Sequence, residues 1–351
     1  MRSDAASLAR MLAERIDTLA RELLPHGRRD GQEWRVGSLS GEAGQSLAVR
    51  LSGERRGVWA DFSSGDRGDA LDLVAGVLFA GNRRDAMTWA RTWLGVETCG
   101  HRMPVTRQPA PRAATESVPD RDAQRRRAQA RQLWHGTPGG IAGTPVESYL
   151  LNRGIDLHEL GRAPGSLRFA PEVWCAEIQR PLPAMIAAIC GGNGKLVAVH
   201  RTWLAKNPHG VWVKADLRNA KKVLGGYAGG VIRLWRGASG LALGVAPQGD
   251  SVILAEGIET GLSVAIACPE RRVLCAVSLS NMGRVILPDT IKEITIAADN
   301  DAGNEPARKA LAMACQKLSE QERRVRLAMP EHTGTDWNDV LRQEQNAEKW
   351  A

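Results

Sequence analysis

The segment ITIAADNDAGNEPARKA, residues 294–310, decides the fold class, because an apolar run passes through an acidic turn into a helical pattern. Two similar segments flank it, ILAEGIETGLSVAIA at residues 253–267 and RVRLAMPEHTGTDWNDVL at residues 324–341. The pattern predicts strands at 251–255, 273–276, 291–298 and 324–328, with helices at 260–267, near 282 and at 304–319. Strands that alternate with helices predict a parallel sheet flanked by helices, an α/β fold.

Carboxylates follow three of these expected strands directly. Glu256 follows the first, Asp299 and Asp301 follow the third, and Asp336 and Asp339 come after the fourth. The carboxyl ends of parallel strands meet at one edge of a sheet, so we expect these groups to converge. Converging carboxylates raise one another's pKa unless a divalent cation neutralises them, and oxygen ligands suit Mg²⁺. Each motif alone is common turn chemistry. Their succession predicts a shared metal site.

Composition narrows the classes of protein. The chain has 351 residues, which is enough for two or three domains. Its formal net charge of +8 favours a polyanionic partner, and the alternative is a compositional bias that says nothing about function. No apolar run approaches the ~20 residues of a membrane span, and the acidic, interrupted start is unlike a secretory signal. The six cysteines lie apart without a C-x-x-C pair, which disfavours disulfides and a cysteine-based zinc site. We expect a cytoplasmic protein.

The rest of the chain predicts further domains. Residues 1–26 have helical spacing, residues 34–62 alternate as a small antiparallel sheet, and helices are expected at 69–79 and 83–94. A proline-rich linker at 100–119 precedes a charged helix. Two strands joined by Gly-Gly-Asn-Gly are expected at 184–203, and another strand pair at 210–234. The expected division is into segments 1–99, 100–136, 137–248, 249–343 and 344–351.

The three acidic segments resemble the Toprim domain that topoisomerases, bacterial-type primases and some nucleases share. The amino-acid sequences of these segments are similar to those of primase-like Toprim proteins of phages, plasmids and integrative elements. Four upstream stretches resemble the α+β subdomain that precedes Toprim in these primases. They are TPVESYLLNRGI (144–155), LRFAP (167–171), PAMIAAICGGNGKLVAVHRTWL (183–204) and KKVLGGYAGGVIRL (221–234).

The resemblance assigns roles to the acidic residues. It implies that Glu256, Asp299 and Asp301 are catalytic and that these three, with Asp336 and Asp339, bind Mg²⁺ or Mn²⁺ in a two-ion site. Asn338 stands where bacterial replicative primases often have a second aspartate, which puts the ligation of a second ion in question.

The segment VWADFSSGDRGDALDLVA, residues 58–75, is similar to the second half of the zinc-ribbon domain of primases. No Cys or His lies between residues 34 and 70. The resemblance therefore implies a small zinc-ribbon-like β domain without zinc. Its stability must then come from apolar side chains, which are Trp34, Leu47, Val49, Trp59 and Phe62.

Basic and aromatic residues supply the candidate contacts to nucleotides and nucleic acid. The phosphate-binding candidates are Arg201, Lys214, Lys221 and Lys222, which could neutralise phosphate charge that the metals leave unmet. The candidate nucleic-acid contacts are Arg55, Arg56, Trp59, Arg125, Arg126 and Arg127. The alternatives are a solvated surface for the charges and core packing for the tryptophans.

The leading functional hypothesis is a DNA primase-like nucleotidyltransferase that makes short RNA primers on single-stranded DNA from ribonucleoside triphosphates. The alternatives are a Toprim metal-dependent nuclease, in which water is the nucleophile, and a non-catalytic DNA-binding accessory of replication. No Walker-A sequence appears, so we expect a separate replicative helicase as partner.

Overall fold

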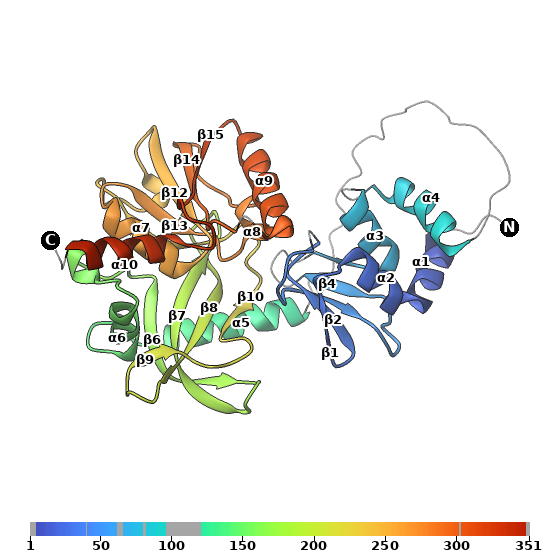
Figure 1. Ribbon diagram of the computed structural model, residues 1–351, viewed down its shortest axis with the longest axis horizontal. Coiled ribbons are helices and arrows are strands. Elements are labelled where there is room, and N and C mark those ends of the chain that lie inside the picture. The colour runs from blue at the N-terminus through green and yellow to red at the C-terminus, as the bar shows by residue number, and fades with distance from the viewer. Residues whose placement is uncertain are drawn as a thin grey trace. The chain divides into compact units, whose positions relative to one another are not determined.

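The computed structural model describes residues 5–39, 41–61, 66–79, 82–95, 121–301 and 303–348 (Figure 1). The chain divides into two compact units, Met1–Gln124 and Arg125–Ala351. Phe62, Cys99 and the proline-rich residues 100–119 lie outside the described residues. None of the described helices is both long and apolar enough to cross a membrane.

The first unit is a small antiparallel sheet packed against helices, as the sequence predicted. Its strands follow one another in space in chain order. They are β1 (Arg28–Asp30), β2 (Glu33–Val36), β3 (Leu47–Arg50), β4 (Trp59–Asp61) and β5 (Arg67–Gly68). Its helices are α1 (Ala5–Glu14), α2 (Ile16–Leu23), α3 (Ala70–Leu78) and α4 (Arg83–Leu94). The helical spacing of residues 1–26 is confirmed in two helices, because the backbone leaves helical geometry at Arg15.

Two buried tryptophans and a helix cap hold this unit together. Trp34 and Trp59 are 6% and 4% exposed, and their indole N–H groups donate to the carbonyls of Leu24 and Asp69, each at 3.0 Å. Asp69 also begins α3 in a reciprocal capping box with Asp72. The unit therefore has an apolar core with hydrogen-bonded indole groups, and its sequence has no cysteine or histidine between residues 34 and 70.

The second unit is built on one ten-stranded sheet. Along its main path the strand order is β10-β8-β7-β11-β13-β12-β14-β15, with β6 paired to β7 and β9 paired to β8. The strands are β6 (Leu167–Cys175), β7 (Arg180–Cys190), β8 (Leu196–Lys206), β9 (Trp212–Lys214), β10 (Lys221–Gly225), β11 (Val231–Arg236), β12 (Asp250–Ala255), β13 (Arg272–Cys275), β14 (Ile291–Ala297) and β15 (Arg324–Ala328).

Helices and two short 3₁₀ turns cover the sheet. They are α5 (Arg121–Gly136), α6 (Pro145–Asn152), η1 (Leu157–Leu160), η2 (Leu243–Val245), α7 (Ile258–Ala267), α8 (Leu279–Met282), α9 (Glu305–Ser319) and α10 (Trp337–Glu348). Strands β12 to β15 are mutually parallel, which confirms the predicted parallel sheet. The strand pair expected within residues 210–234 is wrong, because β9 and β10 each pair with β8 whereas β11 joins β7 and β13.

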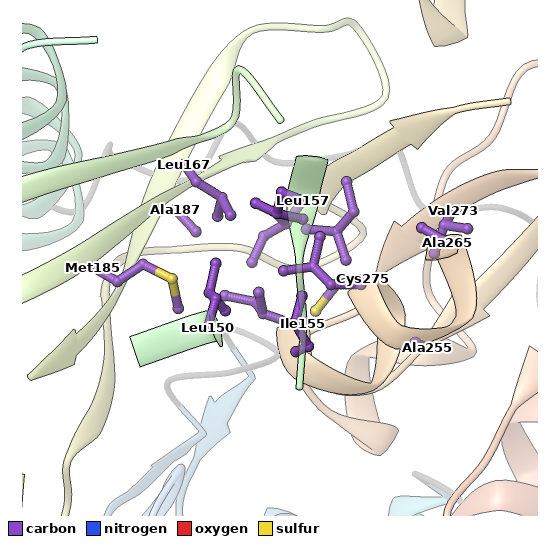
Figure 2. Close-up of a cluster of buried hydrophobic side chains, with 14 of the residues drawn as sticks. Leu150, Ile155, Leu157, Leu167, Met185, Ala187, Ala255, Ala265, Val273 and Cys275 are labelled. Carbon is purple, nitrogen blue, oxygen red and sulfur yellow. The ribbon is translucent and has the colours of Figure 1, made fainter. Parts of the chain in front are cut away.

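Strand β11 makes the antiparallel and parallel halves into one sheet. It pairs with β7 on one side and β13 on the other. One face carries a core around α6 and α7 that includes Leu150, Met185 and Cys275, and Figure 2 shows these side chains within one buried cluster. The opposite face of the parallel strands packs on α8 and α9. Because the sheet is shared, the antiparallel half, which includes α6, has a fixed position relative to the ends of the parallel strands.

From Arg125 onward, helix α5 belongs to the second unit. Ala130 is fully buried, and Leu133 and Trp134 pack with Trp203 in a separate core. Arg168 of β6 donates hydrogen bonds to the carbonyls of Trp134 and Thr137 at 2.5 and 2.7 Å. The charged helix that was expected after the proline-rich linker is thus anchored by its few apolar side chains.

Replacement of Trp203 by alanine tests this core. Trp203 is 2% exposed and its indole donates to the Val173 carbonyl at 3.0 Å, so Trp203→Ala leaves a cavity and an unpaired carbonyl. We expect a loss of about 3–5 kcal/mol in the free energy of unfolding by chemical denaturation. Trp174→Ala is the matched control, because that ring is 58% exposed. An equal loss in both variants would contradict the packing described.

Candidate active site

A cleft of about 690 Å³ opens where the parallel strands end. Its lining comes from both halves of the second unit. Among the predicted site residues, it contains Glu256, Asp299, Asp301, Asp336, Lys214 and Lys221. A volume of this size lies within the range of small-molecule and cofactor sites.

The acidic wall consists of the strand-end carboxylates. Glu256 follows β12, whereas Asp299 and Asp301 follow β14. Asn300 lies between the two aspartates and ties their turn to the loop before Asp336. Its side chain donates to the Pro330 carbonyl at 2.8 Å, and its backbone N–H donates to the Thr335 carbonyl at 3.0 Å. The structure thus brings the motifs after β14 and β15 to one wall of the cleft.

Asp299 has the electrostatic character of a cation ligand. Burial, followed by the negative charges of Asp336 and Asp301, raises its pKa to about 6. Its Oδ1 atom is buried without a hydrogen-bond partner. A divalent cation would satisfy this oxygen and offset the mutual repulsion, so the residues present fit such an ion. Among the described residues, no three His, Cys, Asp or Glu side chains are already gathered as a metal cluster.

Asp336 and Asp339 also form a reciprocal cap at the start of α10. Asp336 Oδ1 accepts from the Asp339 backbone N–H at 2.9 Å, and Asp339 Oδ2 accepts from the Asp336 backbone N–H at 3.2 Å. Asp336 lines the cleft, whereas Asp339 is absent from its lining. The cap therefore fixes Asp336 at the cleft and gives Asp339 a structural task. The proposed metal-binding role of Asp339 has no support from this placement.

Asn338 points into the protein. It is completely buried, and its side-chain amide donates to the Arg153 carbonyl at 2.8 Å and to Ser263 Oγ at 3.0 Å. An amide can supply these two donors, whereas an ionised aspartate cannot. An asparagine in place of the aspartate found in many replicative primases thus fits a structural role, in which Asn338 connects α10 to α7 and to the end of α6.

The opposite wall carries two of the four predicted phosphate-binding cations. Lys214 of β9 and Lys221 of β10 line the cleft. Arg201 and Lys222 are cross-strand partners and therefore share one face of the sheet. Because side chains alternate along a strand, that face is opposite to the one of Lys221. Arg201 lies over the Trp203 ring, 5.0 Å from its centroid. The prediction that all four cations meet at one phosphate site is therefore wrong.

Sequence reasoning missed Glu259 and Tyr149. Glu259 is 6% exposed, and its carboxylate accepts from the Tyr149 hydroxyl at 2.6 Å and from Lys221 Nζ at 2.9 Å. All three side chains line the cleft. A carboxylate within the apolar helix segment GIETGLSVAIA was the available signal, because a buried acid requires a partner.

The candidate nucleic-acid contacts differ in exposure. Trp59 is buried in the core of the first unit, so the prediction that it stacks on bases is wrong and core packing is its role. Arg55 and Arg56 are exposed in the turn before β4, as are Arg125 and Arg127 on α5, whereas Arg126 is half-buried. The contacts of these five arginines with nucleic acid stay predictions.

Comparisons with known proteins identify the domain that contains the acidic wall. Residues 251–347 match the Toprim domain family, and residues 124–234 match a family described as a domain of unknown function, DUF7146. A search of curated proteins found no match. The C-terminal part of the chain is therefore a Toprim domain, which confirms the resemblance seen in the three acidic segments.

Several solved structures are similar at low identity. The zinc-binding and RNA polymerase domains of the Aquifex aeolicus primase are 16% identical, with a TM-score of 0.38, over 99% of this chain and 84% of that chain. The primase fragment of the bacteriophage T7 primase-helicase is 19% identical, with a TM-score of 0.37, over 61% and 81%. A DnaG primase catalytic domain bound to single-stranded DNA is 13% identical, with a TM-score of 0.41, over 66% and 81%.

The raised pKa of Asp299 predicts that its charge destabilises the metal-free fold. Its ionised carboxylate is disfavoured in the folded state only. The free energy of unfolding therefore falls as pH rises from about 4, the pKa in the unfolded chain, to about 6, the pKa in the folded protein. In EDTA at pH 8 we expect Asp299→Asn to stabilise the protein by about 1–2 kcal/mol, after allowance for solvent screening. The gain should fall to about half at pH 5.

Thermal unfolding in EDTA, at both pH values, measures this effect. Mg²⁺ should then stabilise the wild type more than Asp299→Asn, because the ion binds the charged carboxylate. Glu172→Gln removes an exposed carboxylate of β6 and serves as the control. A loss of stability in Asp299→Asn at pH 8 would contradict the strained state described here.

Proposed function

We propose that the protein is a DNA primase-like enzyme. It joins ribonucleoside triphosphates into short RNA primers on a single-stranded DNA template by metal-dependent nucleotidyl transfer. The reaction takes place in the cytoplasm and serves replication of a phage, plasmid or integrative element. The proposed partner is a separate replicative helicase, which supplies the unwound template.

The observation that carries this proposal is a cleft with walls of opposite charge. The Toprim carboxylates Glu256, Asp299 and Asp301 form one wall. Lys214 and Lys221 line the other wall and belong to the upstream half, which is the antiparallel part of the second unit that precedes the Toprim domain in sequence. Transfer from a nucleoside triphosphate needs both signs of charge, for the metal ions and for the phosphates. Hydrolysis by a Toprim nuclease needs only the carboxylates, so the cationic wall favours the polymerase.

Glu256, Asp299, Asp301 and Asp336 would hold the Mg²⁺ or Mn²⁺ ions. Divalent ions at this wall supply activation of the attacking 3′-hydroxyl and neutralisation of the pyrophosphate leaving group. Lys214 and Lys221 bind the triphosphate and keep its α-phosphate within reach of the 3′-hydroxyl. Asn300 and the α10 cap hold the acidic loops in place during the reaction. The exposed arginines Arg55, Arg56, Arg125 and Arg127 attract the template backbone.

Primer synthesis by variants tests the proposal. Purified protein is incubated with single-stranded DNA of mixed sequence, labelled ribonucleotides and either Mg²⁺ or Mn²⁺, and the products are resolved by length. We expect short oligoribonucleotides from the wild type and a loss of about 100-fold or more in Asp299→Asn, because a ligand of the reacting centre is gone.

The control is Glu293→Gln, which removes an acid from the exposed pair of Glu293 with Arg324 at 3.0 Å and should retain full synthesis. Cleavage of the DNA without added nucleotides, and no product with them, would replace the primase by the nuclease. DNA binding with neither reaction, in every metal condition, would support the non-catalytic accessory.

A further inference from the structure

Glu259 joins the two halves of the cleft through both of its carboxylate oxygens. Its Oε1 atom accepts from the hydroxyl of Tyr149 on α6, and its Oε2 atom accepts from Nζ of Lys221 on β10. Glu259 itself lies in the first turn of α7, in the Toprim domain. Two residues from the upstream half therefore contact one buried Toprim carboxylate.

This carboxylate is fully satisfied and ionised. Burial alone would raise the pKa of Glu259, but the Lys221 charge and the hydrogen bonds from Tyr149 and Lys221 together lower it. Burial and the same carboxylate raise the pKa of Tyr149, which keeps the phenol protonated as a donor. Glu259 thus requires no ligand of its own, and its task concerns the groups that it holds.

Lys221, which donates to Glu259, also lines the cleft. Its side chain remains 39% exposed beside the buried Glu259. Its positive charge offsets part of the rise in the pKa of Asp299 on the opposite wall, so the field of the ammonium reaches the acidic cluster. An ammonium has three N–H donors, and the hydrogen bond to Glu259 uses one of them. Lys221 can therefore keep this ion pair and donate to a ligand oxygen in the cleft.

We propose that Glu259 is a positioning residue that aims Lys221 at the phosphates of a bound polyphosphate. A lysine has a flexible four-carbon stem, and ordering it on binding costs side-chain entropy. The ion pair with Glu259 orders that stem before the ligand arrives. The inference rests on the proposed function for the nature of the ligand, a nucleoside triphosphate or the pyrophosphate released from it.

A double-mutant cycle distinguishes two roles of Glu259, the positioning of Lys221 and a structural latch, by which we mean a contact that only stabilises the junction of the two halves. The probe is inorganic pyrophosphate with Mg²⁺, and its affinity for the full chain is measured by calorimetry. We expect Lys221→Met and Glu259→Gln each to weaken binding about tenfold. The double variant should bind no more weakly than Lys221→Met, because Glu259 acts through Lys221. Glu293→Gln is the control, since it removes an acid from an ion pair on the surface.

Three results would overturn the inference. They are additive losses in the double variant, an unchanged affinity in Glu259→Gln, and a wild type that does not bind pyrophosphate saturably. The predicted cycle without any primer synthesis would instead refute the primase proposal and leave the positioning role standing. The primase proposal and the positioning role of Glu259 can therefore each be refuted without the other.

Tyr149→Phe provides a second test in case Lys221→Met, which leaves Glu259 unpaired, does not fold. The substitution removes the hydrogen bond to Oε1 and leaves the ion pair at Oε2. Positioning through Lys221 predicts a change in pyrophosphate affinity of less than threefold. A structural latch that needs both oxygens predicts a loss equal to that of Glu259→Gln, which would contradict the proposal.

Discussion

Repulsion among carboxylates held at one edge of a parallel sheet is the constraint on which the site depends. Burial and the neighbouring aspartates raise the pKa of Asp299, and its Oδ1 atom has no hydrogen-bond partner. Strand pairing along β12, β14 and β15, the contacts of Asn300 and the cap of α10 keep these groups together. The fold thus maintains an unfavourable arrangement of charge that a divalent cation would relieve.

The upstream half supplies the two predicted phosphate-binding lysines of the cleft, to which the Toprim domain adds Arg342. Because β11 pairs with both β7 and β13, one sheet sets the position of Lys214 and Lys221 opposite the carboxylates. The contacts of Glu259 with Tyr149 and Lys221 add a polar connection across the same junction. Both halves of the second unit therefore contribute side chains to this cleft.

Strand ends were predictable from sequence, whereas the faces of strands and the pairing between halves were not. The order of Glu256, Asp299 and Asp336 along the chain sufficed, since parallel strands bring their carboxyl ends to one edge. Lys221 and Lys222 are neighbours in sequence, and strand alternation places them on opposite faces, which cannot be assigned without the register of β10. Trp59 illustrates the same limit, because composition alone does not distinguish a base-stacking ring from a core ring.

Diffraction from crystals soaked in Mn²⁺ tests the central claim most directly, because the ion's anomalous signal reveals its position without reference to activity. We predict manganese in the cleft, ligated by Asp299 and by at least one of Glu256, Asp301 and Asp336. A cleft without anomalous signal at saturating Mn²⁺, or an ion bound only elsewhere on the chain, would contradict it.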